Sequence, residues 1–103
     1  MVLKLDREPK IVRVDVDSAH LIVDLDDGRK ISIPLEWYPR LLHGTLTERS
    51  HHEIGGGGYG IHWPDLDEDV SVENLLAARP SAEGEASFRR WLSSRSSGEA
   101  PRR

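Results

Sequence analysis

The chain has 103 residues, of which 37% are hydrophobic and 31% are charged, with a net charge of −4 and no cysteine. Such a length accommodates one domain with a modest core, and the missing cysteines exclude disulfides, thiolate metal sites and cysteine nucleophiles. No apolar run reaches membrane-spanning length, and the first ten residues lack the apolar centre of a signal peptide. We therefore expect a cytoplasmic protein without a membrane partner.

Charge is unevenly distributed along the chain. Residues 1–78 carry 8 Lys/Arg and 15 Asp/Glu, a net charge of −7, whereas residues 79–103 carry 6 Arg and 3 Glu, a net charge of +3. We expect a compact α+β domain over 1–78 and a tail over 79–103, with one amphipathic helix and a frayed C-terminus. An acidic body repels phosphate groups, so nucleic acid is a poor primary partner.

Three segments near the N-terminus predict an antiparallel β-meander. The stretches "IVRVDVD" (11–17), "HLIVDL" (20–25) and "KISIP" (30–34) alternate apolar and polar residues, which is the period of a half-buried strand. Gly28 suits the turn in "DDGRK", and the proline of "KISIP" ends the last strand. The residues expected on the core side are Val12, Val14, Val16, Leu21, Val23, Leu25, Ile31 and Ile33.

Proline, glycine and capping residues predict short helices in the middle of the chain. Pro39 cannot sit inside a regular helix, so a short helix should begin near it and end near Gly44. Thr45 and Glu48 match a capping box, which predicts a second short helix over about 46–51.

The second half of the chain predicts a β-hairpin and two further helices. "HEI" and "GIHW" flank four glycines as hairpin arms, with Ile61 and Trp63 on one face and His62 on the other. "WPDLDED" is expected to turn the chain before a short helix in "SVENLLAA" that Ser71 caps. The stripe of Phe, Trp and Leu in "SFRRWLSSR" predicts a final amphipathic helix over about 81–95.

The glycine-rich stretch "GGGGYG" does not match a phosphate-binding loop. A P-loop ends in Gly-Lys-Ser/Thr, and a dinucleotide-binding turn opens a helix, whereas a strand pattern follows here. We interpret the stretch as a wide hairpin turn or a bulge, where glycines adopt unusual backbone angles.

Metal and catalytic signals are weak. A site built from His62 with Asp65 or Asp67 would suit a divalent metal, but a partly exposed histidine beside a solvated turn is the favoured interpretation. "DLDED" resembles the start of a calcium loop but has Val70 and Leu76 where that loop needs Gly and Glu. No serine lies in a nucleophile elbow, so we disfavour an enzyme and expect no cofactor. A metal-binding protein or metal-dependent enzyme is the alternative function.

The leading hypothesis is a non-catalytic protein-interaction or regulatory module. Clustered acidic residues steer a basic partner, and Trp and Tyr anchor interfaces, although most aromatic residues of a small domain belong to its core. An exposed strand edge would also suit a homodimer. The residues predicted to contact the partner are Tyr59, Trp63, Asp65, Asp67, Glu68 and Asp69.

Two longer stretches carry a family resemblance. "DGRKISIPLEWYPRLL" and the later "GYGIHWPDLDEDVSVENLL" resemble the bacterial domain of unknown function 2442, and "ASFRRWLSSR" resembles the ending of one of its subgroups, so that the likeness runs from about 11 to 95. The chain departs from that pattern at Leu46, His52 and Gly55, where proline, an aromatic and an aliphatic residue are common. The resemblance implies a compact α+β domain without an established activity.

The same resemblance implies a biological setting. Family members are often encoded beside another small protein, in a pairing that looks like a toxin–antitoxin or regulatory couple, and some relatives carry an added helix-turn-helix domain. On this basis we expect an antitoxin-like or regulatory member of a two-protein operon.

Overall fold

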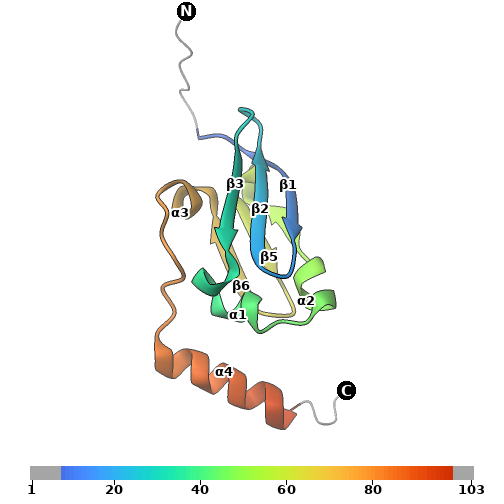
Figure 1. Cartoon of the computed structure of the whole chain (residues 1–103), viewed down its shortest axis with the longest axis vertical. Coiled ribbons are helices and arrows are strands. Elements are labelled where there is room, and N and C mark those ends of the chain that lie inside the picture. The colour runs from blue at the N-terminus through green and yellow to red at the C-terminus, as the bar shows by residue number, and fades with distance from the viewer. Residues whose placement is uncertain (1–7, 99–103) are drawn as a thin grey trace, which may run out of the picture.

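The computed structural model describes residues 8–98 and has the predicted α+β fold, with two three-stranded antiparallel sheets (Figure 1). The strands are β1 (Ile11–Val16), β2 (His20–Leu25), β3 (Lys30–Pro34), β4 (Glu53–Gly55), β5 (Gly60–Trp63) and β6 (Glu68–Ser71). The α-helices are α1 (Pro39–Leu42), α2 (Leu46–Ser50), α3 (Val72–Leu76) and α4 (Glu85–Gly98), and the 3₁₀ helices are η1 (Leu35–Trp37) and η2 (Gly56–Gly58). None of the helices in this part of the chain is long and apolar enough to cross a membrane.

The first sheet is the predicted meander, in the order β1-β2-β3. Gly28 takes a φ of 97° in the turn between β2 and β3, which a residue with a side chain rarely adopts. The prediction that Val12 faces the core is wrong, because Val12 is 58% exposed. The register shifts between Ile11 and Arg13, and this bulge places Ile11 inward in place of Val12, whereas Val14 is buried as predicted.

The second sheet has the order β4-β5-β6 and contains one strand more than the predicted hairpin. β4 and β5 are the expected arms, with Ile61 and Trp63 buried. The turn after β5 is shorter than expected, because Glu68 already pairs with Trp63 at the start of β6. Asp67 closes this turn with a φ of 52°.

Short helices lie at the predicted places, with α1 and α2 between the two sheets and α3 directly after the second sheet. α1 begins at Pro39, and Thr45 caps α2 through the predicted capping box, in which the Glu48 backbone N–H donates to Thr45 Oγ1 over 3.1 Å. α3 begins after Ser71, whose hydroxyl accepts a 3.1 Å hydrogen bond from the Asn74 backbone N–H, as predicted.

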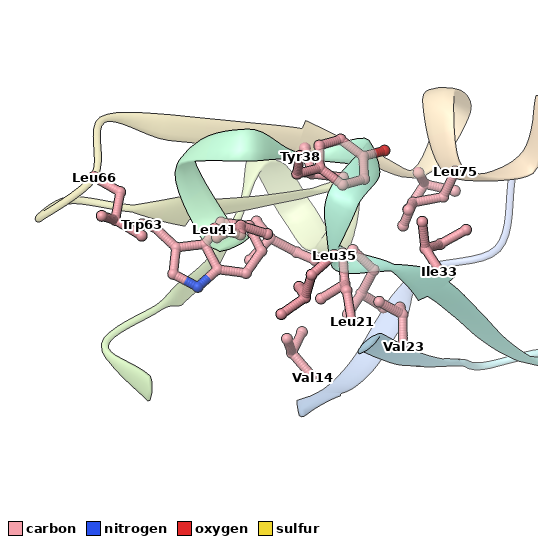
Figure 2. Packing of buried hydrophobic residues seen from close by; sticks show 14 of the residues in the cluster. Val14, Leu21, Val23, Ile33, Leu35, Tyr38, Leu41, Trp63, Leu66 and Leu75 are labelled. Carbon is pink, nitrogen blue, oxygen red and sulfur yellow. The ribbon is translucent and has the colours of Figure 1, made fainter. Parts of the chain in front are cut away.

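A single hydrophobic core joins the inner faces of both sheets with η1, α1 and α3 (Figure 2). Leu21 and Val23 enter it from the first sheet, and Trp63 enters it from the second. All three side chains have no solvent-exposed surface. Because each sheet buries one face here, the other face of each sheet is directed toward solvent.

The C-terminal helix α4 begins at Glu85, later than the predicted residue 81, and continues beyond the predicted end at 95. It lies across the end of the molecule that carries α1 and α2 (Figure 1). The Phe88 ring is tilted against His43, with 5.3 Å between the ring centres, and the guanidinium groups of Arg40 and Arg95 lie 5.1 and 4.7 Å from the centre of the Trp91 ring. The helix thus packs on the body. Its status as a separate unit over 79–103 stays a prediction. The expectation that "SSGEAPRR" (96–103) is frayed is wrong for 96–98, which continue α4, and its remainder, 99–103, lies outside the described residues.

Candidate interaction site

Strand alternation divides the second sheet into an inner face and an outer face. Residues that pair across an antiparallel sheet point to the same side, and successive residues point to opposite sides. Two cross-strand rows therefore lie on the outer face, opposite the core. One row is Glu53, His62 and Asp69, and the other is Gly55, Gly60 and Ser71.

A groove of about 430 Å³ opens on this outer face. Its middle coincides with the second row, in which two of the three residues have no side chain. The wall on one side is the pair of His62 and Asp69, and the wall on the other side comes from η2 and α3. The lining residues are Gly55, Gly56, Gly60, Ile61, His62, Asp69, Val70, Ser71 and Asn74.

His62 and Asp69 form the polar wall of the groove. His62 Nδ1 lies 2.8 Å from Asp69 Oδ1, and the two side chains are 40% and 75% exposed. An ion pair with this much exposure contributes little to stability, at most about 1 kcal/mol. The His62–Asp69 pair therefore contributes little to the stability of the fold. Because both side chains line the groove, they are accessible to a molecule that binds there.

The groove does not contain an assembled hydrolase triad. A histidine and a carboxylate activate a serine only when the hydroxyl lies within hydrogen-bond reach of the imidazole. The Ser71 hydroxyl instead accepts the Asn74 backbone N–H as the cap of α3. Within residues 8–98, the structure gives no hydrogen bond between Ser71 and His62.

The predicted acidic residues do not form one surface. Asp65 pairs with His51, with 2.8 Å between Oδ2 and Nδ1, and Asp67 lies 4.0 Å from Arg40. Only Asp69 faces the groove. No group of three or more His, Asp or Glu side chains among residues 8–98 is arranged to hold a metal ion.

Trp63 and Glu68 belong to the core, which corrects their prediction as surface contacts. Both side chains point inward because Trp63 pairs with Glu68 on the inner face of the second sheet. Trp63 is fully buried, and its indole N–H donates to the Arg49 carbonyl over 3.0 Å. Trp63 therefore cannot pack beside the acidic turn at the surface.

Glu68 is the buried acidic residue of this sheet, with 9% exposure. Burial raises the pKa of its carboxyl to about 7, because water no longer stabilises the charged form. The charge of Arg40 lowers this pKa, whereas the charges of Glu83, Asp69 and Asp67 raise it further. A half-neutral, buried carboxyl group cannot act as a surface contact for a basic partner.

Tyr59 lies beside the groove at the start of β5 and is half-buried. The Lys10 ammonium lies 5.9 Å from its ring centre, and the Tyr59 carbonyl accepts the Val72 backbone N–H over 2.9 Å. Of the six residues predicted for the interface, Asp69 is the one that lines the groove.

The sequence prediction missed the groove itself. Gly55, Gly60, Ser71 and Asn74 come from three separate segments, and they meet only because β5 pairs with both β4 and β6. The alternation in "EDVS", with Glu68 and Val70 on one side and Asp69 and Ser71 on the other, was the available signal.

Fold and site together define a small α+β domain with a groove on an exposed sheet face. The chain belongs to the family described as "Protein of unknown function (DUF2442)", whose model matches residues 11–81. This confirms the resemblance seen in the sequence, while α4 lies beyond the matched residues.

Two solved structures are similar to this chain. A crystal structure of a protein of unknown function from Rhodospirillum rubrum shares 33% identity and a TM-score of 0.66, and the match covers 75% of this chain and 95% of that one. A solution NMR structure of an uncharacterized protein from Chromobacterium violaceum has a TM-score of 0.62 at 23% identity, over 71% of this chain and 69% of that one, and supports the fold alone. No curated protein matches the chain.

Proposed function

We propose that the chain is a non-catalytic protein-interaction or regulatory module that binds its partner on the outer face of the β4–β6 sheet. The observation that carries this proposal is the groove, which hollows a solvent-facing sheet surface while the opposite face of the same sheet forms the core. Its polar wall is a pair of exposed groups that contributes little to folding.

Charge favours a basic partner surface. Glu53 and Asp69 lie in one row of the outer face, and the part of the chain up to residue 78 has a net charge of −7. Opposite charge on the partner would accelerate encounter and fix its orientation. The setting that we propose is an antitoxin-like or regulatory role in a two-protein operon of a bacterial cytoplasm, which follows from the family resemblance.

Self-association is part of the same proposal. The edge strand β4 has three exposed residues, and Ile54 in its centre is 42% exposed. Unpaired strand edges that carry apolar side chains tend to pair with another chain. A second copy that covers β4 would make a symmetric dimer, which sedimentation of the purified chain at several concentrations would detect.

Coexpression with the product of the adjacent gene tests the proposal. The charge-reversal variants Asp67→Lys and Asp69→Lys separate the acidic turn from the groove, and Asp15→Lys is the control on the outer face of the first sheet, where Asp15 is exposed. We expect copurification with the wild type, Asp67→Lys and Asp15→Lys, and its loss with Asp69→Lys. Copurification that survives Asp69→Lys would remove the groove face from the proposal.

A further inference from the structure

The two glycines at the centre of the groove are not required by backbone geometry. Gly55 has φ and ψ of −132° and −173°, an extended conformation open to any residue, and a Cβ atom built there meets nothing within 4 Å. A Cβ atom on Gly60 would lie at ordinary contact distances, 3.7 Å from the Val70 carbonyl oxygen and 4.0 Å from that of Gly55. Because neither glycine has a side chain, the two residues leave a bare strip of backbone across the sheet.

This bare strip has the dimensions of a long, unbranched side chain. It crosses from β4 over β5 to β6, and two strand spacings amount to roughly 10 Å. Gly55 and Gly60 pair directly with each other, and Ser71 continues the row on β6. An aliphatic chain laid on the strip would contact backbone atoms and the side walls, which removes apolar surface from water.

The row beside the strip supplies acceptors for a cation. His62 Nδ1 lies 2.8 Å from Asp69 Oδ1, and a carboxylate offers acceptor sites on both of its oxygens. Glu53 pairs in register with His62 on the same face, and the structure gives it no ion pair within residues 8–98. Two carboxylates thus lie with His62 in one row along the strip.

The opposite rim already contacts one cation of this chain. Arg79 Nη1 donates to Asn74 Oδ1 over 3.0 Å, and Asn74 lines the groove. None of the groove-lining residues is a lysine or an arginine. The side of the strip that the Glu53–His62–Asp69 row flanks therefore combines negative charge with open space, which disfavours an anionic ligand.

We propose that the groove receives one lysine or arginine side chain from an extended segment of a protein partner, with the aliphatic stem over Gly55 and Gly60 and the cationic head at Asp69. This inference rests on the proposed function and names the partner chemistry of the same site. It makes the bare strip the element that selects a long basic side chain over a short or branched one.

NMR titration with model peptides tests this inference directly. The probe is an acetylated and amidated Gly-Ser-Lys-Ser-Gly peptide, and its matched control replaces lysine by norleucine, which has a similar stem without the charge. We expect the lysine peptide to shift the backbone amides of Gly55, Gly60, His62 and Ser71 with a Kd on the order of millimolar. We expect norleucine to bind roughly tenfold more weakly, and added salt to weaken the lysine complex.

Two groove variants separate the strip from the charge. Gly60→Val fills the strip at a position that accepts a side chain, and its control is Ser32→Val on an exposed position of β3. Asp69→Asn removes the charge but keeps the shape, and its control is Asp15→Asn. Each groove variant should weaken the lysine peptide roughly tenfold, and each control should leave its affinity unchanged. Amide dispersion like that of the wild type verifies that each variant is folded.

Two results would overturn the inference. One is equal binding of the lysine and norleucine peptides, and the absence of binding of either peptide at millimolar concentration counts as this result. The other is an affinity for the lysine peptide that is the same in Gly60→Val as in the wild type. If the adjacent gene product copurifies equally with the wild type and Gly60→Val, this inference fails while the interaction module stands. If Asp69→Lys also retains that partner, the proposed binding face fails as well.

Discussion

Arg40 and Glu83 join the body of the protein to the segment that leads into α4. Arg40 Nη2 donates to Glu83 Oε2 over 2.7 Å and Nε donates to Oε1 over 2.9 Å, with only 14% and 12% of the two side chains exposed. Such two-point, partly buried pairs are stronger than surface pairs. The guanidinium also lies against Trp91, so one arginine contacts both the linker and the helix.

Glu83→Gln should loosen α4 without unfolding the sheets. The change leaves the Arg40 guanidinium without its carboxylate partner, at an expected cost of about 1–2 kcal/mol. Amide hydrogen exchange over residues 85–95 should accelerate roughly tenfold, while the strands stay protected. Arg89→Gln is the matched control on the same helix, because the Arg89–Glu85 pair is 73% and 75% exposed and should contribute almost nothing. Equal acceleration in both variants would show that the Arg40–Glu83 pair does not hold the helix.

Glu68 should make the protein less stable as pH rises, whereas an ordinary ion-paired carboxylate makes a protein less stable as pH falls. Burial raises its pKa from 4.5 in the unfolded chain to about 7 in the folded protein. The folded protein therefore binds the proton more tightly, and this contribution is complete below pH 4.5 and is lost as pH rises to about 7. The pKa difference corresponds to a loss of about 3 kcal/mol.

Glu68→Gln isolates this effect from the other carboxylates. The pKa of Glu83 and of Glu48 is lowered by hydrogen bonds from Arg40 and Arg95, so those two groups contribute stability that is lost on acidification. Both groups remain in the variant, and urea unfolding at pH 5 and pH 8 reports the difference from wild type. The free energy of unfolding of the variant, relative to that of wild type, should be higher at pH 8 than at pH 5. A difference that is constant between the two pH values would contradict the burial of a titrating Glu68.

Gly44→Ala should destabilise the protein through a steric clash. A Cβ atom at Gly44 would lie 2.9 Å from a Leu66 methyl carbon and 3.2 Å from the Arg40 carbonyl oxygen, which belongs to the backbone of α1. The expected cost is about 1–3 kcal/mol, seen as a Tm lower by roughly 4 °C or more. Gly84→Ala is the control, because a Cβ atom there meets nothing within 4 Å, and its Tm should equal or exceed that of wild type.

Trp63→Phe should reveal the structural role of the buried indole. The variant keeps an aromatic ring in the core but loses the donor to the Arg49 carbonyl and leaves a small cavity. We expect a loss of about 1–3 kcal/mol in chemical unfolding, together with unchanged binding of the adjacent gene product at temperatures where the variant is folded. Weakened binding by the folded variant would indicate that Trp63 contributes to the interface with the partner.

The predictions that the structure confirms depend on residues close together in the chain. The Thr45–Glu48 capping box, the start of α1 at Pro39 and the turn at Gly28 each follow from a few adjacent residues. The exposed position of Val12 depends on a bulge in the pairing of β1 with β2, which alternation along one strand does not reveal.

The groove could not be predicted for a related reason. The sequence "DEDVS" has the acidic composition of a turn, yet its pairing with β5 makes it a strand and turns Glu68 inward. Proximity in sequence predicts one acidic surface, whereas strand alternation places Glu68 and Asp69 on opposite faces of the sheet. Only the pairing of three strands brings Glu53, Gly60 and Asp69 onto one face.

The most direct test of the account is an NMR map of the surface that the partner covers. The isotope-labelled chain is titrated with the purified product of the adjacent gene, and backbone amide shifts are followed along the sequence. We predict that the shifts concentrate on the outer face of the second sheet, at Glu53, Gly55, Gly60, His62, Asp69 and Ser71. Shifts confined to the first sheet or to α4, with the groove residues unchanged, would contradict the central claim.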